Sequence, residues 1–243
     1  MIILGLDALD ANVVEKFNCK NLMQIEYGKT DIGGFALERT VVLWASFLTG
    51  KDMENEIPIK GQWEFKLQKE NTFFNFFDFV KTVDVPAFSL KLVNHEKERA
   101  LLAGFFKNEN KIEEFDDFVW KNHEKNKKDF FTVLDDFPHA DVTDKSKIIM
   151  GYFDLGDAIG HLSFGDESKM KRVYKELDEL ALKTKNHAKK NGDTVLIVSD
   201  HGMKTVGRFG DHTKNGFYSF NKKLEIGMPK ITDFFEIVKK FAR

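Results

Sequence analysis

The sequence has little of what marks a secreted, membrane-spanning or nucleic-acid-binding protein. Its single cysteine, Cys19, excludes an internal disulfide, so nothing indicates an oxidising compartment. The apolar run at residues 1–6 lacks a basic leader and is too short for a signal or membrane segment. The formal net charge of −2 argues against a general binder of nucleic-acid polymers, which is normally basic. We therefore expect a cytoplasmic protein with a small-molecule partner and no membrane or nucleic-acid partner. The oligomeric state is left open.

Internal repeats, low-complexity segments and a recognisable domain linker are also missing. The 243 residues are 42% apolar and 31% charged, which is ordinary for a globular protein and enough for a substantial core. We expect one domain.

The most informative stretch is residues 194–201, TVLIVSDH. Its apolar and β-branched residues run without alternation, which is typical of a strand covered on both faces of a parallel sheet. The run stops at Asp200 and His201, and Gly202 lets the backbone turn sharply. Ligands of open α/β sheets bind beyond the carboxyl ends of strands. Alone, however, an Asp at a strand end serves equally well as the N-cap of the next helix.

Two other predicted strands end in the same way. Residues 1–6 lead to Asp7, and residues 147–153 lead into Asp157 and His161. Residues 167–190 have the spacing of a long amphipathic helix, which connects the second of these strands to the strand at 194–198. This alternation of strands and helices predicts an α/β fold with a parallel sheet.

Other segments give less regular patterns. Helices are expected over residues 40–50, 72–81, 95–106, 112–134 and 231–242, and strands over 83–88 and 216–220. Residues 51–72 are expected to form a loop over the site, with Trp63 and Phe65 in its wall. We expect His95, His123 and His139 at the surface.

Thr40 stands at the start of the predicted helix over residues 40–50, which Gly50 ends. As an N-cap, Thr40 would lie among unpaired backbone N–H groups at the positive end of the helix dipole, where anions bind. Taken alone, this segment fits a simple cap in front of a buried helix better than an anion site.

Six side chains suited to metal binding follow the predicted strands. They are Asp7, Asp157, His161, Asp200, His201 and His212. Asp and His are ligands of Zn²⁺ and similar ions, and six groups are too many for one tetrahedral ion but suit two. If the three carboxylates converge, they repel one another unless cations lie between them. Two ions ~4 Å apart can clamp the attacking and leaving oxygens of a phosphoryl displacement, and the Thr40 hydroxyl is the candidate nucleophile.

The order and spacing of these motifs resemble the alkaline phosphatase superfamily, in the branch of type I phosphodiesterases and nucleotide pyrophosphatases. The motifs are Asp7 after the first strand, Thr40 nine residues before Thr49-Gly50, D-x-x-G-H at 157–161, S-D-H-G-M at 199–203, and G-D-H ending in His212. The resemblance covers nearly the whole chain. It implies a three-layer α/β/α sandwich with a mostly parallel central sheet, in a single domain over 1–243 whose residues 51–140 form a reduced cap.

The resemblance also implies a two-metal-dependent phosphoesterase, of the phosphodiesterase or nucleotide pyrophosphatase type. Asp157, His161 and His212 would then hold one divalent ion. The other ion would be held by Asp7, Asp200, His201 and the Thr40 oxygen. Thr40 would attack phosphorus and form a phosphothreonine intermediate, which water then hydrolyses. Zinc is commonest among such relatives and manganese also occurs; imidazole-rich ligation favours zinc.

Two departures bear on the substrate. Leu43 stands where nucleotide pyrophosphatases usually carry an Asn that holds a phosphate oxygen. The proline often found in this segment is absent, because Val41 and Val42 follow Thr40 directly. Nucleotide substrates are therefore not implied, and Arg39 is the nearest candidate for holding a second phosphate charge. Alternatives are a phosphomonoesterase or phosphotransferase of the same superfamily, or a non-catalytic protein that binds a phosphorylated ligand. A sulfatase is disfavoured, because residues 40–43 lack the C/S-x-P-x-R context.

Overall fold

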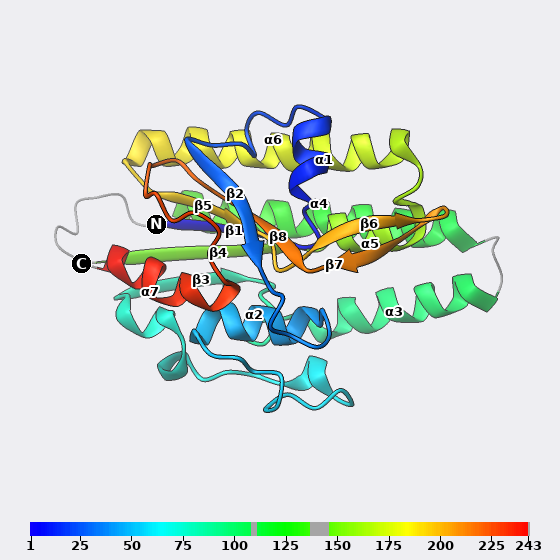
Figure 1. Ribbon diagram of the computed structural model, residues 1–243, viewed down its shortest axis with the longest axis horizontal. Helices are drawn as coiled ribbons and strands as arrows, with labels where there is room; N and C mark the ends of the chain where they lie inside the picture. The colour runs from blue at the N-terminus through cyan, green and yellow to red at the C-terminus, as the bar shows by residue number, and fades with distance from the viewer. Residues whose placement is uncertain (108–110, 137–145, 243) are drawn as a thin grey trace.

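The computed structural model describes residues 1–107, 111–136 and 146–242, and a six-stranded sheet lies at its centre between two layers of helices (Figure 1). The strand order is β2-β8-β5-β1-β4-β3. The strands are β1 (Ile2–Leu6), β2 (Glu26–Asp31), β3 (Phe79–Val83), β4 (Lys147–Phe153), β5 (Val195–Val198) and β8 (Asn215–Phe220). Pairing is parallel from β5 through β1 and β4 to β3, whereas β8 runs antiparallel to both its neighbours. The predicted three-layer, mostly parallel α/β fold is confirmed.

The central strand β1 is buried on both faces of the sheet. Ile2, Leu4 and Leu6 point into one hydrophobic core, and Ile3 points into the other. At Gly5 an added Cβ would lie 2.8 Å from the ring of Trp44, so only glycine lets that indole pack against the strand. This two-sided burial explains why the strand reads as a continuous apolar run.

One face of the sheet is covered by α1 (Ala11–Lys16), α4 (Ile112–Asp136), α5 (Leu155–Ser163) and α6 (Glu167–Asn191). The last of these helices confirms the predicted amphipathic pattern, because Met170, Val173 and Leu177 are buried against the core. Its N-cap Asp166 accepts a hydrogen bond from the Lys169 backbone N–H. Its C-cap, Gly192, has φ +70°.

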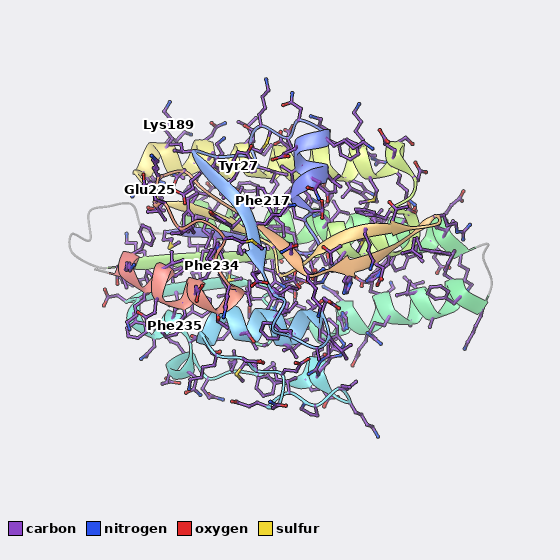
Figure 2. The ribbon with its side chains drawn as sticks, in the orientation of Figure 1. Tyr27, Lys189, Phe217, Glu225, Phe234 and Phe235 are labelled. Carbon is purple, nitrogen blue, oxygen red and sulfur yellow. The ribbon has the colours of Figure 1, made fainter. Side chains whose placement is uncertain are left out.

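The other face is covered by α2 (Thr40–Thr49) and α7 (Phe234–Lys239). Phe234 of α7 packs against Phe47 of α2 and Tyr218 of β8, and Figure 2 shows how α7 lies along this layer. Gly50 ends α2 with φ +69°, as predicted. The predicted N-cap is wrong by one residue: Arg39 has the extended cap conformation, and Thr40 is the first helical residue.

Residues 51–140 contribute to the sheet and to its covering layers. Their described residues supply the edge strand β3, short 3₁₀ helices at Gln62–Glu64, Lys69–Asn71 and Phe73–Phe76, α3 (Leu92–Lys107) and α4. In α4, the Phe130 ring packs 5.7 Å from the Phe153 ring of β4. This part of the chain therefore takes part in the core as well as in the wall above the site.

The boundary between the first helix and strand of this region was wrongly predicted. Residues 72–81 form a 3₁₀ turn followed by β3 instead of one helix, because Phe73 and Phe74 are both fully buried. The strand predicted over 83–88 is a turn. Asp84 has φ +60° and accepts hydrogen bonds from the Lys91 backbone N–H and the Asn126 side chain, which fixes the chain in that turn.

Other parts of the structure also differ from the sequence-based predictions. The hairpin of β6 (Gly202–Val206) and β7 (Phe209–Thr213) and the strand β2 were not predicted. His123 was expected at the surface but is 1% exposed, with Nε2 3.2 Å from Glu176 Oε1. His139 lies outside the described residues. Within the described part of the chain, every helix is too short or too polar to cross a membrane.

Candidate metal centre and active site

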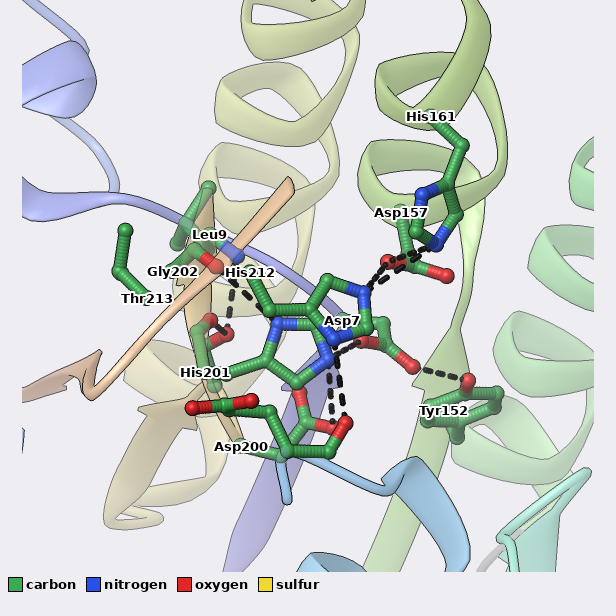
Figure 3. Close-up of polar contacts among 12 residues, drawn as sticks. Asp7, Leu9, Tyr152, Asp157, His161, Asp200, His201, Gly202, His212 and Thr213 are labelled. Atoms are coloured by element: carbon green, nitrogen blue, oxygen red, sulfur yellow. Dashed lines mark hydrogen bonds and ion pairs between the residues drawn. The ribbon is translucent and has the colours of Figure 1, made fainter. Parts of the chain in front are cut away.

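The first group of predicted ligands lies at the carboxyl ends of β1 and β5. Asp7 follows β1, while Asp200 and His201 follow β5, and each is at most 1% exposed. His201 Nε2 lies 3.3 Å from Asp7 Oδ1 and 3.4 Å from Asp200 Oδ2 (Figure 3). One ligand atom from each residue lies within 4.8 Å of the others, a spacing that a single ion can bridge. We call these three residues the buried trio.

His201 is oriented as a metal-binding imidazole would be. Its Nδ1 lies 3.1 Å from the Gly202 carbonyl oxygen, which can only accept, so Nδ1 carries the proton and Nε2 a lone pair. Burial, followed by the charge of His212, lowers the pKa of His201 to about 3, so the ring is neutral at pH 7. The lone pair of Nε2 thus faces two carboxylates.

The buried trio is short of positive charge. Asp7 Oδ1, both carboxylate oxygens of Asp200 and His201 Nε2 are buried without a hydrogen-bond partner. Burial and the charge of Asp157 raise the pKa of Asp7 to about 7; burial and the charge of Asp7 raise the pKa of Asp200 well above its ordinary value. Unpaired acceptors in this arrangement fit a divalent cation.

The second group joins α5 to the β6–β7 hairpin. Asp157 and His161 stand four residues apart on one face of α5, with His161 Nε2 3.3 Å from Asp157 Oδ1. His212 on β7 places Nε2 3.2 Å from the same oxygen and 3.1 Å from His161 Nε2. Its Nδ1 lies 3.1 Å from the Glu38 carbonyl oxygen, which again leaves Nε2 free to bind. We call these three residues the hairpin trio.

The charges of the hairpin trio are strongly coupled. The negative charge of Asp157 raises the pKa of His161 to about 9. Burial opposes ionisation of Asp157, but His161 and His212 together lower the pKa of that carboxyl well below its usual range. A dication can replace the proton that Asp157 and His161 hold between them.

The two trios are neighbours. The rings of His201 and His212 stack with centroids 3.8 Å apart and an interplanar angle of 25°. All six predicted ligands are therefore brought together on one edge of the sheet, although positions 7 and 212 are far apart in the chain (Figure 3).

Two glycines of α5 allow this close approach. A Cβ at Gly156 would lie 2.6 Å from the Asp7 carbonyl oxygen, and a Cβ at Gly160 would collide with the sulfur of Met203. Met203 lies on β6 and is paired in register with His212. The hairpin thus packs directly on α5, and this packing carries His212 to Asp157.

Thr40 lies on the wall of a cavity of about 240 Å³ that Asp7, Asp157, His161 and His212 also line. It is 8% exposed and is the first residue of α2, whose leading N–H groups have no intrahelical acceptor. The residue Thr40, the whole hairpin trio and Asp7 of the buried trio therefore line one cavity, with Asp200 and His201 buried behind Asp7.

Several residues of this cavity were not found from the sequence. Tyr152, inside the apolar strand β4, donates a hydrogen bond from its phenol to Asp7 Oδ2. His95, expected at the surface, lines the cavity and stacks on Trp63 with ring centroids 3.6 Å apart. Glu98, Arg99 and Leu102 of α3 also line it, and Asp154 does so from the turn before α5. The i, i+4, i+7 spacing of His95, Arg99 and Leu102 is the sequence signal that could have identified this helix face.

Three further residues were placed by the structure. Trp63 lines the cavity as expected, but Phe65 lines a separate one. The Arg39 guanidinium donates to the Ile57 and Glu54 carbonyl oxygens at 2.9 and 3.0 Å. Leu43 is fully buried in the core behind α2.

Comparisons with solved structures support the fold. The alkaline phosphatase of the Antarctic bacterium TAB5 matches with a TM-score of 0.55 and 10% identity, over 99% of this chain and 96% of that one. An inactive variant of murine ectonucleotide pyrophosphatase/phosphodiesterase 5, in complex with AMP, matches with a TM-score of 0.51 and 13% identity, over 86% of this chain and 58% of that one. A sulfatase from Pseudoalteromonas sp. matches with a TM-score of 0.51 and 9% identity, over 99% of this chain and 67% of that one. At these identities the likeness shows the fold alone.

A search of curated proteins finds no match. The family model of type I phosphodiesterases/nucleotide pyrophosphatases, in contrast, matches residues 63–219, which is more than half of the chain and includes Asp157, His161, Asp200, His201 and His212. The chain belongs to the type I phosphodiesterase/nucleotide pyrophosphatase family.

Proposed function

We propose that this protein is a two-metal phosphodiesterase that uses Thr40 as its nucleophile. The observation that carries the proposal is the pair of trios beside the Thr40 hydroxyl, with four buried acceptor atoms in the buried trio that have no partner. The buried trio with the Thr40 oxygen would hold one divalent ion, and the hairpin trio would hold the other. Bound there, the ions would act as Lewis acids that neutralise negative charge on the transferring phosphoryl group.

In the proposed first step, the Thr40 oxygen attacks phosphorus while the bond from phosphorus to the leaving oxygen breaks. The hydroxyl proton passes to the departing oxygen or to solvent, so the leaving group departs as an alcohol or alkoxide, and the phosphothreonine formed on Thr40 still carries the second ester group. Because Thr40 is the first residue of α2, the leading N–H groups of that helix would lie beside the transferring phosphoryl group and could donate hydrogen bonds to its oxygens.

In the second step, a water oxygen attacks the phosphothreonine and the bond from phosphorus to the Thr40 oxygen breaks. Thr40 regains its proton, and the phosphate monoester leaves. Because Asp7, Asp200 and His201 are buried, we expect their side chains to keep their positions through both steps.

Zinc is the ion that the donor set favours. Three imidazoles and three carboxylates supply mixed nitrogen and oxygen ligation, which suits Zn²⁺ and is also compatible with Mn²⁺. Activity restored to metal-free protein by each ion separately identifies the one required.

The proposal is tested with Thr40→Ala. We expect hydrolysis of a nitrophenyl phosphodiester to be abolished while the bound metal, measured by elemental analysis, largely remains. Thr49→Ala is the matched control, because Thr49 ends the same helix and its hydroxyl donates to the Ala45 carbonyl oxygen. Unchanged turnover in Thr40→Ala would remove Thr40 from the mechanism. Hydrolysis of nitrophenyl phosphate alone, with no diester turnover, would make the protein a phosphomonoesterase.

A further inference from the structure

One wall of the cavity comes from one face of α3. His95, Arg99 and Leu102 line the cavity at i, i+4 and i+7, and the Trp63 ring stacks on His95 in the same wall. The helix is anchored in the core by Phe105, which is 1% exposed, and it packs along α4. The backbone of this helix is therefore held in place beside the cavity that Thr40 also lines.

The Arg and Lys side chains of this cavity differ in whether their N–H groups are engaged. Arg39 donates both terminal nitrogens to the Ile57 and Glu54 carbonyl oxygens. Lys91 donates to Asp129 Oδ2 at 2.8 Å and to Asn126 Oδ1 at 3.2 Å. Both cations are thus held by the protein's own acceptors.

Arg99 differs from both. Among the Arg and Lys side chains that line the cavity in the described residues, it is the one with no hydrogen bond or ion pair. The nearby imidazole of His95 does not add a second positive charge, since burial and then the charge of Arg99 lower its pKa to about 4. Arg99 is exposed and lines the cavity, so its planar guanidinium can turn toward a bound anion and take two oxygens of a phosphate or carboxylate side by side.

We propose that Arg99 binds a second anionic group on the substrate, so that the preferred substrates are phosphodiesters bearing another phosphate or a carboxylate. This proposal rests on the phosphodiesterase function proposed above. Arg99 then takes the role that the sequence suggested for Arg39, which is to bind a second negative charge of the substrate. Arg39 itself donates to backbone carbonyl oxygens. Binding there would act on the substrate away from the reacting phosphorus, and we expect it to appear mainly in KM.

Three nitrophenyl phosphodiesters with the same nitrophenolate leaving group test the proposal. Their second substituents are ethyl, 2-carboxyethyl and 2-phosphoethyl, so they differ in the extra anion and share the bond that breaks. With the unmodified protein we expect kcat/KM for at least one anionic diester to exceed that for the ethyl diester by roughly five- to tenfold. The ratio between the two anionic diesters then identifies which group Arg99 prefers.

In Arg99→Ala we expect this preference to fall to within about twofold, through a higher KM for the anionic diesters, and in Arg99→Lys to return in part. Lys97→Ala is the matched control. It removes one positive charge from the same helix, where Lys97 lies 4.9 Å over the Phe118 ring and does not line the cavity. The preference should survive in this variant.

The outcomes separate the two proposals. Equal kcat/KM for all three diesters in the unmodified protein, or a preference that persists in Arg99→Ala, would overturn the role of Arg99 and leave the phosphodiesterase function in place. Failure of the metal-loaded protein to hydrolyse any of the three would contradict the phosphodiesterase function itself.

Discussion

The phenol of Tyr152 donates a hydrogen bond to Asp7 Oδ2, and this contact leaves Asp7 Oδ1 directed toward His201 (Figure 3). Tyr152 is 5% exposed, and its ring packs 5.6 Å from the Trp44 ring. Burial and the charge of Asp7 raise the pKa of the phenol well above its ordinary value, so it remains a donor. Tyr152 therefore fixes which oxygen of Asp7 is available to an ion.

The first prediction concerns this contact. Tyr152→Phe removes the phenol oxygen but keeps the ring, so the carboxylate of Asp7 becomes free to rotate. We expect the affinity of the buried trio for Zn²⁺ to fall roughly ten- to a hundredfold, as is usual when a partner of a metal ligand is lost. Competition with a chelator measures this affinity. Tyr218→Phe, which loses a hydrogen bond to the Gly227 carbonyl oxygen, is the control; equal affinity in the two variants would exclude a positioning role for Tyr152.

The second prediction concerns the packing of the hairpin on α5. Gly160→Ala places a methyl group against the sulfur of Met203, so the hairpin must move and carry His212 with it. We expect weaker metal binding at the hairpin trio and lower activity, with the buried trio less affected. The affinity of each site can be followed by titrating Co²⁺ and recording its visible absorption.

Gly104→Ala is the control for this substitution. A Cβ at Gly104 in α3 would meet its nearest neighbour, a side-chain carbon of Lys111 beyond the end of that helix, at 3.6 Å, which is an ordinary van der Waals contact. This variant should bind metal as the unmodified protein does and be slightly more stable, because Ala favours a helix. Unchanged metal binding in Gly160→Ala would show that the Met203 side chain moves aside while the hairpin keeps its position.

The third prediction is a pH effect on the metal-free protein. The pKa of Asp7 is raised to about 7 and that of His161 to about 9. Both folded values lie above the unfolded ones, so each group contributes stability at low pH that is lost as the pH rises through its folded pKa. The pKa of His201 is lowered to about 3, so its contribution to the free energy of unfolding does not change with pH above pH 7. Asp7 loses its contribution mainly between pH 3.8 and about 7, and His161 loses its contribution between pH 6.5 and about 9. The Tm without metal should therefore fall between pH 7 and pH 9, chiefly through His161, by roughly 5 °C.

When metal is bound, the ions replace these protons, so the decrease in Tm between pH 7 and pH 9 should disappear. Calorimetry at constant ionic strength, with and without Zn²⁺, measures both curves. A metal-free Tm that stays level or rises over this interval would mean that His161 does not hold its proton as its surroundings indicate.

The residues that sequence reasoning found are those that follow a buried strand. Asp7 and Asp200 stand just beyond an apolar strand, and Asp157 lies in the first turn of the helix that follows one, so these patterns are local. Parallel strands then bring their carboxyl ends to one edge of the sheet, so convergence follows from topology alone. His212 was found through its motif, although the hairpin that carries it was not.

The hairpin was missed because three of the five residues of β6 are exposed and its sequence has no strand-like alternation. Its position depends on Met203 packing against Gly160, a contact between distant parts of the chain. Tyr152 was missed for the opposite reason. It lies within an apolar strand, and only the register of β4 beside β1 brings its phenol to Asp7. His95 and Arg99 required the position of α3 relative to the sheet, which no local pattern contains.

The number of divalent ions bound by the unmodified protein and by one variant of each trio tests the account most directly. Asp200→Ala removes a buried carboxylate that has no hydrogen-bond partner, and His161→Ala opens the hairpin trio, so neither should prevent folding. We predict two zinc ions per chain in the unmodified protein and one in each variant, measured by elemental analysis after dialysis. No bound zinc in the unmodified protein, or two ions retained in both variants, would contradict the proposal that these trios hold a pair of metal ions beside Thr40.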